Sequence, residues 1–204
     1  MYSQYQEEEY ILKYFRGRTG RFLDIGACDG ATFSNTLALA KAGWMGTLVE
    51  PSDHNFRLLC WNYSYLPSIP RNLVNAAILT RPGTFRESVV DPVHNRACRL
   101  LGGTEDAHIA KWSGSGVEFE PTPIEAMDPA TLIERFPGPY EFVSIDTEGT
   151  SVEILKALPL ADMRTELVCV EHDGGYRDVM NFLATRWGLT RTIYQNNCNI
   201  LIGR

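Results

Sequence analysis

Short apolar segments and amphipathic segments alternate along most of the chain. Apolar runs typical of buried strands occupy residues 21–26, 44–51, 72–79, 140–146 and 165–173. Segments with apolar residues three and four positions apart, typical of helices, occupy residues 34–43, 53–66, 128–136 and 151–158. Parallel strands need long crossover connections, which helices usually supply. The alternation therefore predicts an α/β fold, with a mostly parallel sheet and helices on both faces.

The two ends of the chain depart from this alternation. Near the N-terminus, apolar residues recur on one helical face, Ser3 and Gln6 fit a capping box, and Gly17 fits a C-terminal stop. Near the C-terminus, residues 179–188 have a helical pattern, and residues 189–204 read as two strands around a polar turn. We therefore expect a helix before the sheet and an antiparallel strand pair after it, which brings the sheet to seven strands.

Residues 81–123 do not follow the alternation. This segment is rich in Gly, Pro and Ser, and it is longer than the ~12–15 residues that a plain loop usually reaches. We expect short strands and a mobile flap here, inserted into a single domain that spans residues 1–204. Segments of this kind often cover a site, and an insertion without a functional role fits the pattern about as well.

Length, composition and charge narrow the classes of protein. The 204 residues suffice for one sizeable core, and 44% hydrophobic and 22% charged residues are ordinary globular values. No apolar run approaches the ~20 residues of a membrane span, and the acidic N-terminal stretch is unlike a signal peptide. A net charge of −6 offers no broad surface for phosphate backbones. We therefore expect a cytoplasmic protein that binds neither membrane nor nucleic acid.

The first predicted strand runs into the sequence DIGACDG, where a strand turns into a helix. Gly26 and Gly30 permit positive φ angles and a close approach of a ligand to the backbone. Their spacing differs from the G-x-G-x-x-G fingerprint of dinucleotide-binding proteins, and Asp24 and Asp29 place negative charge where a pyrophosphate would lie. The turn suits a cation better than a phosphate. The alternative is a purely structural turn in which the acids cap the helix.

Glu50 ends the second predicted strand, 20 residues after Gly30. Doubly wound folds place a carboxylate here that accepts hydrogen bonds from ribose hydroxyls. The alternative is an acid that is merely solvated at a strand end. Together, the glycine turn, this acid and the doubly wound pattern indicate a nucleoside ligand that lacks phosphates and carries positive charge. S-adenosylmethionine, whose sulfonium group is a cation, matches this description.

Acidic residues also follow the fourth and fifth predicted strands. Asp146 and Glu148 lie in SIDTEG, and Glu171, His172 and Asp173 lie in VEHDG. Such carboxylates repel one another unless a proton or a metal ion neutralises them. Asp146, Glu171 and Asp173 are therefore candidate ligands for Mg²⁺ or Mn²⁺, and Asp146, Glu148 and His172 are candidate catalytic groups. In the alternative interpretation, Asp146 and Glu148 cap the next helix and Glu171 pairs with an arginine.

Four stretches together resemble the FkbM family of S-adenosylmethionine-dependent methyltransferases. They are SQYQEEEYILKYF, FLDIGACDGATFSNTLAL, GWMGTLVEP and FVSIDTEGTSVEILKAL, and the resemblance runs from about Ser3 to Ile202. It implies a Rossmann-like class I methyltransferase fold. The chain departs from the family at Cys28, where relatives often have asparagine.

The resemblance also implies a set of cofactor-binding residues around the glycine turn and the next two strand ends. They are Asp24, Gly26, Ala27 and Gly30 in the turn, Ser34 and Asn35 beside the methionine, Glu50 at the ribose, Pro51 in its loop, and Asn75 and Ala76 beside the adenine. Asn75 fits a strand-end cap equally well.

The resemblance further implies methyl transfer to a hydroxyl of a sugar or a glycosylated small molecule. The acids after strands four and five are similar to the metal-binding positions of catechol-type and macrolide-sugar O-methyltransferases. Within residues 81–123, Trp112 and His108 are candidates to close over a sugar ring, so we expect this segment to serve the acceptor rather than the cofactor. Two alternatives stay open: a methyltransferase fold kept as a binding module, and a nicotinamide-dependent oxidoreductase, for which the chain lacks the second glycine and a Tyr-x-x-x-Lys motif.

Overall fold

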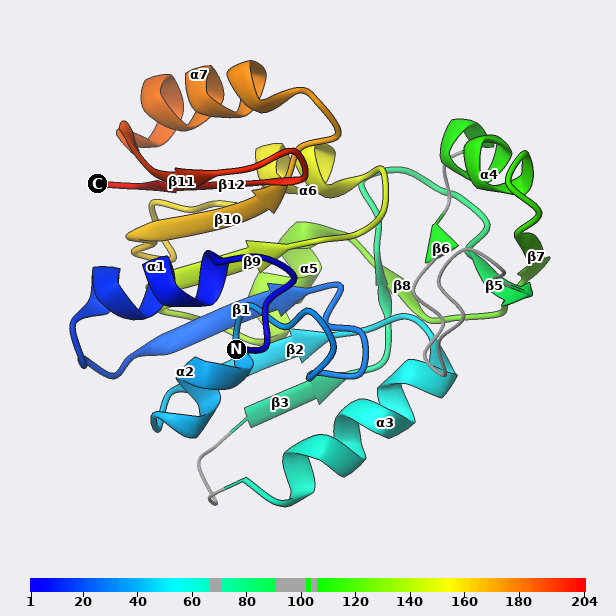
Figure 1. Ribbon diagram of the computed structural model, residues 1–204, viewed down its shortest axis with the longest axis horizontal. Coiled ribbons are helices and arrows are strands. Elements are labelled where there is room, and N and C mark those ends of the chain that lie inside the picture. Colours follow the sequence, from blue (N-terminus) through cyan, green and yellow to red (C-terminus); the bar gives the residue numbers. More distant parts are fainter. Residues whose placement is uncertain (67–70, 91–101, 104–105) are drawn as a thin grey trace.

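A mostly parallel sheet forms the centre of the protein (Figure 1). The computed structural model describes residues 1–66, 71–90, 102–103 and 106–204. The strands of the sheet are β1 (Arg21–Ile25), β2 (Met45–Val49), β3 (Arg71–Val74), β9 (Phe142–Ile145), β10 (Leu167–Glu171), β11 (Arg191–Gln195) and β12 (Asn199–Gly203). Their order is β11-β12-β10-β9-β1-β2-β3. Neighbours from β3 to β10 pair in parallel, and β12 runs antiparallel to both β10 and β11, which confirms the sheet and the C-terminal pair.

Helices cover both faces of this sheet, as the alternation predicts. One face packs against α1 (Glu7–Phe15), α2 (Leu37–Lys41) and α3 (Asp53–Ser64), and the other against α5 (Pro129–Arg135), α6 (Ser151–Ala157) and α7 (Tyr176–Trp187). Successive side chains of a strand point to opposite faces. Phe22 therefore packs in the apolar cluster under α1, α2 and α3, and Leu23 packs in the cluster under α5, α6 and α7. None of the helices in the described ranges is long and apolar enough to cross a membrane.

The register of the parallel strands aligns their carboxyl ends. Ile25 of β1 lies opposite Val49 of β2 and Ile145 of β9, and Ile145 lies opposite Val170 of β10. The residues that follow these positions therefore leave the sheet at one common edge. This edge receives the glycine turn, Glu50 and the acids that follow β9 and β10, which the sequence places at separate points of the chain.

The inserted segment, residues 81–123, lies beyond this edge (Figure 1). It contains β5 (Arg86–Val90), β6 (Gly102–Gly103), α4 (Asp106–Ser113) and β7 (Glu118–Pro121). The three strands form a small antiparallel sheet, β6-β5-β7, which confirms the expected short strands. Helix α4 was not predicted. On either side of the segment, β4 (Ala77–Ile78) and β8 (Ala126–Met127) pair in parallel.

Residues 72–79 do not form the single strand that their apolar run predicts. Strand β3 ends at Val74, and β4 starts at Ala77 in a different sheet. Between them, the Asn75 amide donates to the carbonyl oxygens of Glu50 (2.9 Å) and Pro51 (3.1 Å). These two bonds hold the chain at the end of β2, and the run of apolar residues continues in a new direction.

Two helices begin later than the sequence predicts. Helix α1 begins at Glu7, and its N-cap residue Gln6 makes no side-chain cap bond, so the predicted capping box is wrong. Helix α2 begins at Leu37 rather than near residue 34, because the Ser34 hydroxyl accepts the backbone N–H of Leu37 (3.0 Å) and ends the loop there. The predicted cap of α5 is confirmed, since Asp128 accepts the N–H of Thr131 at 2.9 Å.

Candidate functional site

A cavity of about 530 Å³ lies at the common edge of the parallel strands. This volume falls within the ~300–1,000 Å³ of small-molecule sites. The predicted site residues that line it are Asp24, Gly26, Ala27, Ser34, Asn35, Glu50, Pro51, Ala76, Asp146, Glu148 and Glu171. Those that do not line it are Gly30, Asn75, His172 and Asp173. The fold therefore brings most of the predicted cofactor residues and most of the predicted acidic cluster into one space.

Gly26 closes the glycine turn against the neighbouring strand. Its φ is +86°, and its N–H donates to the carbonyl of Val49 at 2.9 Å. A Cβ atom at this position would lie 1.7 Å from the carbonyl oxygen of Asp146. Only glycine fits there, because no side chain can occupy space already taken by backbone. The end of β1 is thereby packed directly against the end of β9.

The two aspartates of this turn have different roles. Asp24 is buried and accepts the Thr36 hydroxyl at 2.6 Å, and burial raises its pKa to about 6. Asp29 accepts the backbone N–H groups of Ala31 (2.8 Å) and Thr32 (2.6 Å). Asp29 therefore stabilises the turn itself rather than a helix start, since α2 begins only at Leu37, whereas Asp24 lines the cavity.

Glu50 is a buried acceptor rather than a solvated acid, since only 5% of it is exposed. Its Oε2 accepts the N–H of Cys28 and its Oε1 accepts the N–H of Ser52, both at 2.8 Å. Burial raises its pKa to about 7, and the nearby charge of Glu87 adds to this effect. The carboxyl group thus joins the glycine turn to the start of α3, and it faces the cavity.

The side chains after the turn hold the loop that leads to α2. Ser34 accepts two backbone N–H groups, those of Thr36 (3.3 Å) and Leu37 (3.0 Å). The Asn35 amide donates to the Ser144 hydroxyl of β9 at 3.3 Å. Both residues line the cavity, so the loop is fixed by its own polar side chains where it borders the space.

The acids at the carboxyl ends of β9 and β10 converge on one point. One carboxylate oxygen each from Asp146, Glu148 and Glu171 lies within 4.8 Å of the others. Burial, followed by repulsion from the neighbouring acids, raises the pKa of Glu171, and burial also raises that of Asp146. Their carboxyl groups share a hydrogen bond that favours the proton on Glu171. Oxygen donors of this kind suit Mg²⁺ or Mn²⁺, so the set of three fits a divalent cation as well as it fits a shared proton.

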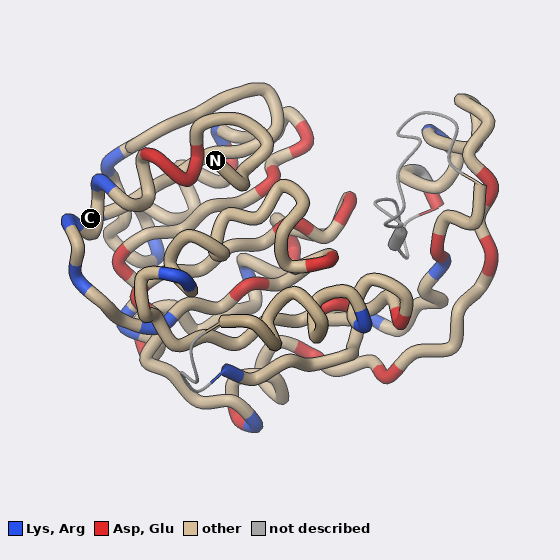
Figure 2. The backbone as a smooth tube through the Cα atoms, turned by 60° about the horizontal axis from the view of Figure 1, so that its bottom comes forward, with Lys and Arg blue, Asp and Glu red and all other residues tan. Residues whose placement is uncertain are grey.

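Acidic side chains dominate the charge of the cavity lining. Its lining includes six carboxyl groups, those of Asp24, Glu50, Glu87, Asp146, Glu148 and Glu171, and among the described residues no Lys, Arg or His lines it. Figure 2 shows Asp and Glu on the loops that face the inserted segment. Buried acids in such a lining favour a ligand that brings positive charge or hydrogen-bond donors. A phosphate-bearing ligand would meet repulsion here.

Comparisons with known proteins agree with this geometry. The model of the methyltransferase FkbM domain matches residues 24–188. The chain belongs to the FkbM methyltransferase family. Its family membership indicates a methyltransferase.

The other comparisons of this FkbM methyltransferase add no functional information. No curated protein matches the chain. Among solved structures, a hypothetical protein from Thermus thermophilus is 19% identical, with a TM-score of 0.46, and the match covers 98% of this chain and 85% of that one. At that TM-score the likeness carries no inference.

His172 of this FkbM methyltransferase holds a turn. It is buried, its Nδ1 accepts the N–H of Gly174 (3.0 Å), and its Nε2 lies 3.1 Å from the carbonyl of Asn196. The first bond requires an unprotonated Nδ1, so Nε2 carries the proton and donates to Asn196. Neither ring nitrogen faces the cavity lining, which contrasts with the predicted role of His172 as a base.

Three other predicted site residues do not line the cavity either. Gly30 has a φ of +71° and packs against α3, where a Cβ atom would lie 2.4 Å from Leu59. Asn75 bonds to two backbone carbonyls, as its strand-end alternative predicts. Asp173 is exposed and lies outside the group of three converging oxygens, in which Glu148 occurs instead.

The inserted segment supplies site residues that the sequence did not reveal. Phe85, Glu87 and Trp112 line the cavity, and of these only Trp112 was a candidate. His108 does not line the cavity but lies beside Trp112, with its Nε2 3.5 Å from Glu148 Oε2, and burial lowers the pKa of His108. The alternation in residues 85–88 was the available signal, because it places Glu87 on the same side of a strand as Phe85.

Proposed function

We propose that this protein is an S-adenosylmethionine-dependent O-methyltransferase that acts on a hydroxyl of a sugar or a glycosylated small molecule. The observation that carries the proposal is the cavity with six carboxyl groups and, among the described residues, no cationic side chain. S-adenosylmethionine is a nucleoside that carries a sulfonium and an ammonium group and no phosphate. Its charge is the one that this cavity attracts, and the family match supports the same reaction.

The residues at the ends of β1 and β2 fit the nucleoside part of this cofactor. Glu50 presents carboxylate oxygens that are already oriented by two backbone N–H groups and that accept ribose hydroxyls. Gly26 leaves the backbone bare beside the cavity, which permits close approach of the ligand. When bound, the cofactor supplies an electrophilic methyl group. The role of the chain is to hold that group in line with the acceptor and to exclude water.

The residues at the carboxyl ends of β9 and β10 fit the acceptor. A hydroxyl is a poor nucleophile until its proton is removed, and Glu148 lines the cavity where a carboxylate can accept that proton. Glu148 is held on its outer side by His108 of the inserted segment. Asp146 and Glu171 keep the local charge negative beside it. Removal of the proton and positioning of the oxygen are then done by the same cluster.

Asp146, Glu148 and Glu171 would also hold a divalent cation, with Mg²⁺ or Mn²⁺ favoured by their oxygen donors. Such an ion would lower the pKa of the acceptor hydroxyl. In its absence, a proton shared by Asp146 and Glu171 relieves the repulsion, and Glu148 serves as the base. A chelator should abolish the metal-dependent reaction and leave the metal-free reaction unchanged.

Trp112 favours a carbohydrate-containing acceptor. It forms part of the cavity wall on the side of the inserted segment, and its neighbour His108 lies 6.4 Å away between ring centroids. A large aromatic surface beside polar acceptors suits a sugar ring, which has apolar faces and a hydroxyl-rich edge. A nicotinamide-dependent oxidoreductase is disfavoured, because its dinucleotide carries a pyrophosphate into a cavity lined with acids.

Calorimetric titration with S-adenosylhomocysteine tests the cofactor, with NAD as the competing ligand. We expect S-adenosylhomocysteine to bind and to raise the melting temperature, because it stabilises the folded state by mass action. Glu50→Gln should weaken binding by about 1.5–3 kcal/mol, the range for hydrogen bonds to a charged group. Glu166→Gln is the matched control, since Glu166 directly precedes β10 in the sequence and lies at the opposite end of the sheet.

Two results would count against the proposal. Binding of NAD without S-adenosylhomocysteine would reject the cofactor, and equal affinities in the two glutamine variants would mean that Glu50 does not hold the ribose. A binding module, in contrast, would take up S-adenosylhomocysteine and show no turnover with any hydroxyl acceptor in a screen of sugars and glycosides.

A further inference from the structure

The C-terminal hairpin of β11 and β12 contributes an asparagine to the cavity. Asn199 begins β12, and it lines the cavity although only 4% of the residue is exposed. Because β12 runs antiparallel to β10, the start of β12 lies at the edge where the parallel strands end, and Asn199 lies opposite Glu171 there. A residue close to the C-terminus therefore belongs to the same edge as the glycine turn and the acidic cluster.

Glu7 of α1 fixes the orientation of the Asn199 amide. Glu7 is fully buried. Its Oε1 accepts the side-chain amides of Asn196 at 2.7 Å and Asn199 at 3.1 Å, and its Oε2 accepts the backbone N–H of Tyr5 at 3.0 Å. A carboxylate oxygen can only accept a hydrogen bond, so the amide nitrogen of Asn199 must face Glu7. The amide oxygen of Asn199, Oδ1, is thereby turned away from Glu7.

Asn35 presents a second amide oxygen to the cavity. Its Nδ2 donates to the Ser144 hydroxyl at 3.3 Å and to the Cys169 sulfur at 3.5 Å. Neither its Oδ1 nor that of Asn199 accepts a hydrogen bond from any residue that the structure describes. Neither oxygen is fully enclosed by protein, and since both residues are buried in the lining, the open side of each oxygen is the cavity. The protein therefore leaves both oxygens to a ligand or to water.

The two amide oxygens lie in the same corner as the carboxyl group of Asp24. Asp24, Ser144 and Cys169 are successive partners across β1, β9 and β10, so they form one row on the sheet. Asn35 lies on this row through its bonds to Ser144 and Cys169. Asn199 lies diagonally across from Cys169 on β12, and such neighbours are ~7–8 Å apart. Three hydrogen-bond acceptors thus gather on one face of the sheet, beside the cavity.

An ammonium group fits this corner better than the other polar groups of the proposed cofactor do. It carries three N–H donors and no acceptor, and the corner offers three acceptors. A carboxylate would meet the charge of Asp24 and two amide oxygens, all of which repel it. A hydroxyl has one O–H to donate and would leave the other two acceptors unused.

We propose that Asn199 determines cofactor specificity, and that its Oδ1 accepts a hydrogen bond from the ammonium group of S-adenosylmethionine, beside Asn35 Oδ1 and Asp24. This inference rests on the function proposed above. It assigns the C-terminal hairpin to the cofactor, although that hairpin is the part of the sheet farthest along the chain from the glycine turn. It also gives the site a preference for ligands that carry a free, protonated amino group.

The analogue of S-adenosylhomocysteine in which hydrogen replaces the amino group tests this contact by calorimetry. The wild-type protein, Asn199→Val and Asn197→Val are each titrated with S-adenosylhomocysteine and with this deamino analogue. Valine is close to asparagine in size and suits a strand, but it offers no oxygen. Asn197→Val is the matched control, because Asn197 is an exposed asparagine in the turn of the same hairpin and does not line the cavity.

We expect the wild type and Asn197→Val to bind the deamino analogue roughly tenfold to a hundredfold more weakly than S-adenosylhomocysteine, the range for hydrogen bonds to a charged group. Asn199→Val should bind S-adenosylhomocysteine about tenfold more weakly than the wild type does. Its affinity for the deamino analogue should equal that of the wild type, because the lost contact has no partner in this ligand.

The comparison of the two ligands separates a direct contact from a structural role. A merely structural role of Asn199, for example through Glu7, would weaken the binding of both ligands equally. Equal weakening in Asn199→Val, or normal binding of S-adenosylhomocysteine, would overturn the inference. Should this variant not fold, Asn199→Ala allows the same comparison with a smaller side chain.

Failure of this inference is distinguishable from failure of the proposed function. If the wild type does not bind S-adenosylhomocysteine, the cofactor itself is rejected. If the wild type binds it and Asn199→Val keeps the full penalty for loss of the amino group, the cofactor stands and the ammonium contact is rejected. If Asn199→Val binds both ligands normally and only its KM for the methyl acceptor rises, the amide serves the methyl acceptor and the inference is likewise wrong.

Discussion

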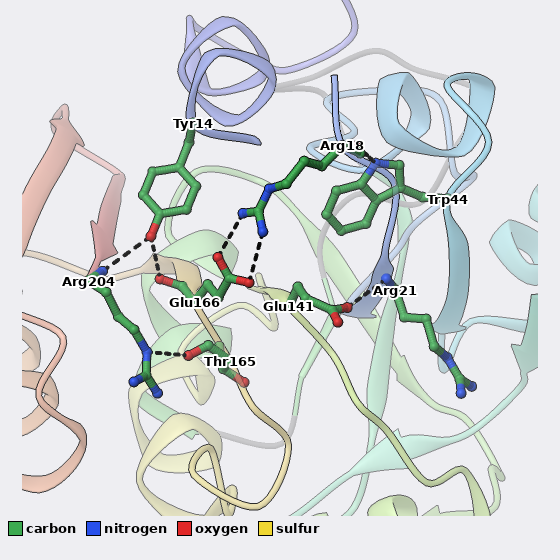
Figure 3. Close-up of polar contacts among 8 residues, drawn as sticks. All are labelled: Tyr14, Arg18, Arg21, Trp44, Glu141, Thr165, Glu166 and Arg204. Carbon is green, nitrogen blue, oxygen red and sulfur yellow. Dashed lines mark hydrogen bonds and ion pairs between the residues drawn. The ribbon is translucent and has the colours of Figure 1, made fainter. Parts of the chain in front are cut away.

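The two ends of the central sheet treat their acidic residues in opposite ways. At the end where the parallel strands begin, acids bond to cations and backbone donors (Figure 3). Arg18 donates to both carboxylate oxygens of Glu166, at 2.8 and 3.3 Å, and this neighbour raises the pKa of the arginine. Glu141 accepts the backbone N–H of Arg21 at 2.8 Å. Tyr14 adds a bond to the carbonyl of Glu166 at 3.0 Å.

At the end where the strands terminate, the acids contact hydroxyls, N–H groups and one another. Burial raises the pKa of Asp24 to about 6 and that of Glu50 to about 7. It also raises the pKa of Glu171, which lies against Asp146. None of these acids has a Lys, Arg or His beside it in the described cavity lining.

The contrast shows where the fold buries carboxyl groups without stabilising their charge. Burying a carboxylate without a cation is costly, and a protein that needed only stability could pair it, as Glu166 is paired. Groups with strongly raised pKa values in a cavity are typical of functional sites. The end of the sheet that carries the cavity therefore has the character of a functional site. The following variants are designed to test this difference between the two ends.

Gly26→Ala should have the largest effect, because Gly26 is where the ends of β1 and β9 meet. The new Cβ would lie 1.7 Å from the Asp146 carbonyl oxygen. Gly17→Ala is the control: Gly17 has a φ of +76° and no atom within 4 Å of the added Cβ. Urea unfolding should show a loss of about 1–2 kcal/mol for Gly17→Ala and at least ~4 kcal/mol for Gly26→Ala. Equal losses would show that only the backbone angle matters.

Asp146→Asn should have the second-largest effect. We expect turnover to fall at least about a hundredfold, or ~2.7 kcal/mol, while the affinity for S-adenosylhomocysteine stays nearly unchanged. The asparagine removes charge from the acidic cluster but keeps the backbone that packs against Gly26. The reaction is measured with a competent acceptor before and after EDTA, followed by Mg²⁺ or Mn²⁺. Full activity of the wild type in EDTA would reject the metal and leave Glu148 as the base.

The affinity for S-adenosylhomocysteine should rise about tenfold between pH 6 and pH 8. Glu50 has a pKa of about 7 in the free protein, and ribose hydroxyls bind its ionised form better. The effect on stability has the opposite sign. Since the pKa is raised on folding, the contribution of Glu50 to stability is present below pH ~4.5 and is lost as the pH rises through 7. In Glu50→Gln, both dependences should flatten in calorimetry and thermal melts.

Trp112→Ala should lower turnover about three- to tenfold, the range of one aromatic contact, and should spare cofactor affinity. This result would assign α4 to the acceptor rather than to the cofactor. If cofactor affinity and turnover fall together, Trp112 supports the cavity as a whole rather than the acceptor. Steady-state kinetics with calorimetry on the same preparation gives both numbers.

Arg18→Ala should have the smallest effect, at the opposite end of the sheet. The pair with Glu166 is partly exposed, and such pairs contribute about 0–1 kcal/mol. Urea unfolding should therefore shift by less than ~1 kcal/mol, and affinity for S-adenosylhomocysteine should not change. A loss of binding in this variant would contradict the division of the sheet into a structural end and a functional end.

The sequence by itself determined the sheet and the part of the cavity that the glycine turn and Glu50 form. Strand and helix periodicities are local, so they predict the parallel strands and the helices on both faces. The glycine turn and Glu50 follow strand ends directly, and parallel strands align those ends whatever the loops do. Their positions were therefore predictable, and the structure places Gly26 and Glu50 on the same cavity.

Only the tertiary structure decided which side chains at the ends of β9 and β10 and within β5 face the cavity. Glu148 and Asp173 both have positive φ values, +51° and +44°, which turn the chain in ways that residue spacing does not encode. As a result Glu148 joins the acidic cluster, Asp173 points outwards, and His172 bonds within its own turn. Glu87 reaches the cavity because β5 pairs with β7 and brings this side chain to Ser52, which depends on long-range packing and not on the local pattern.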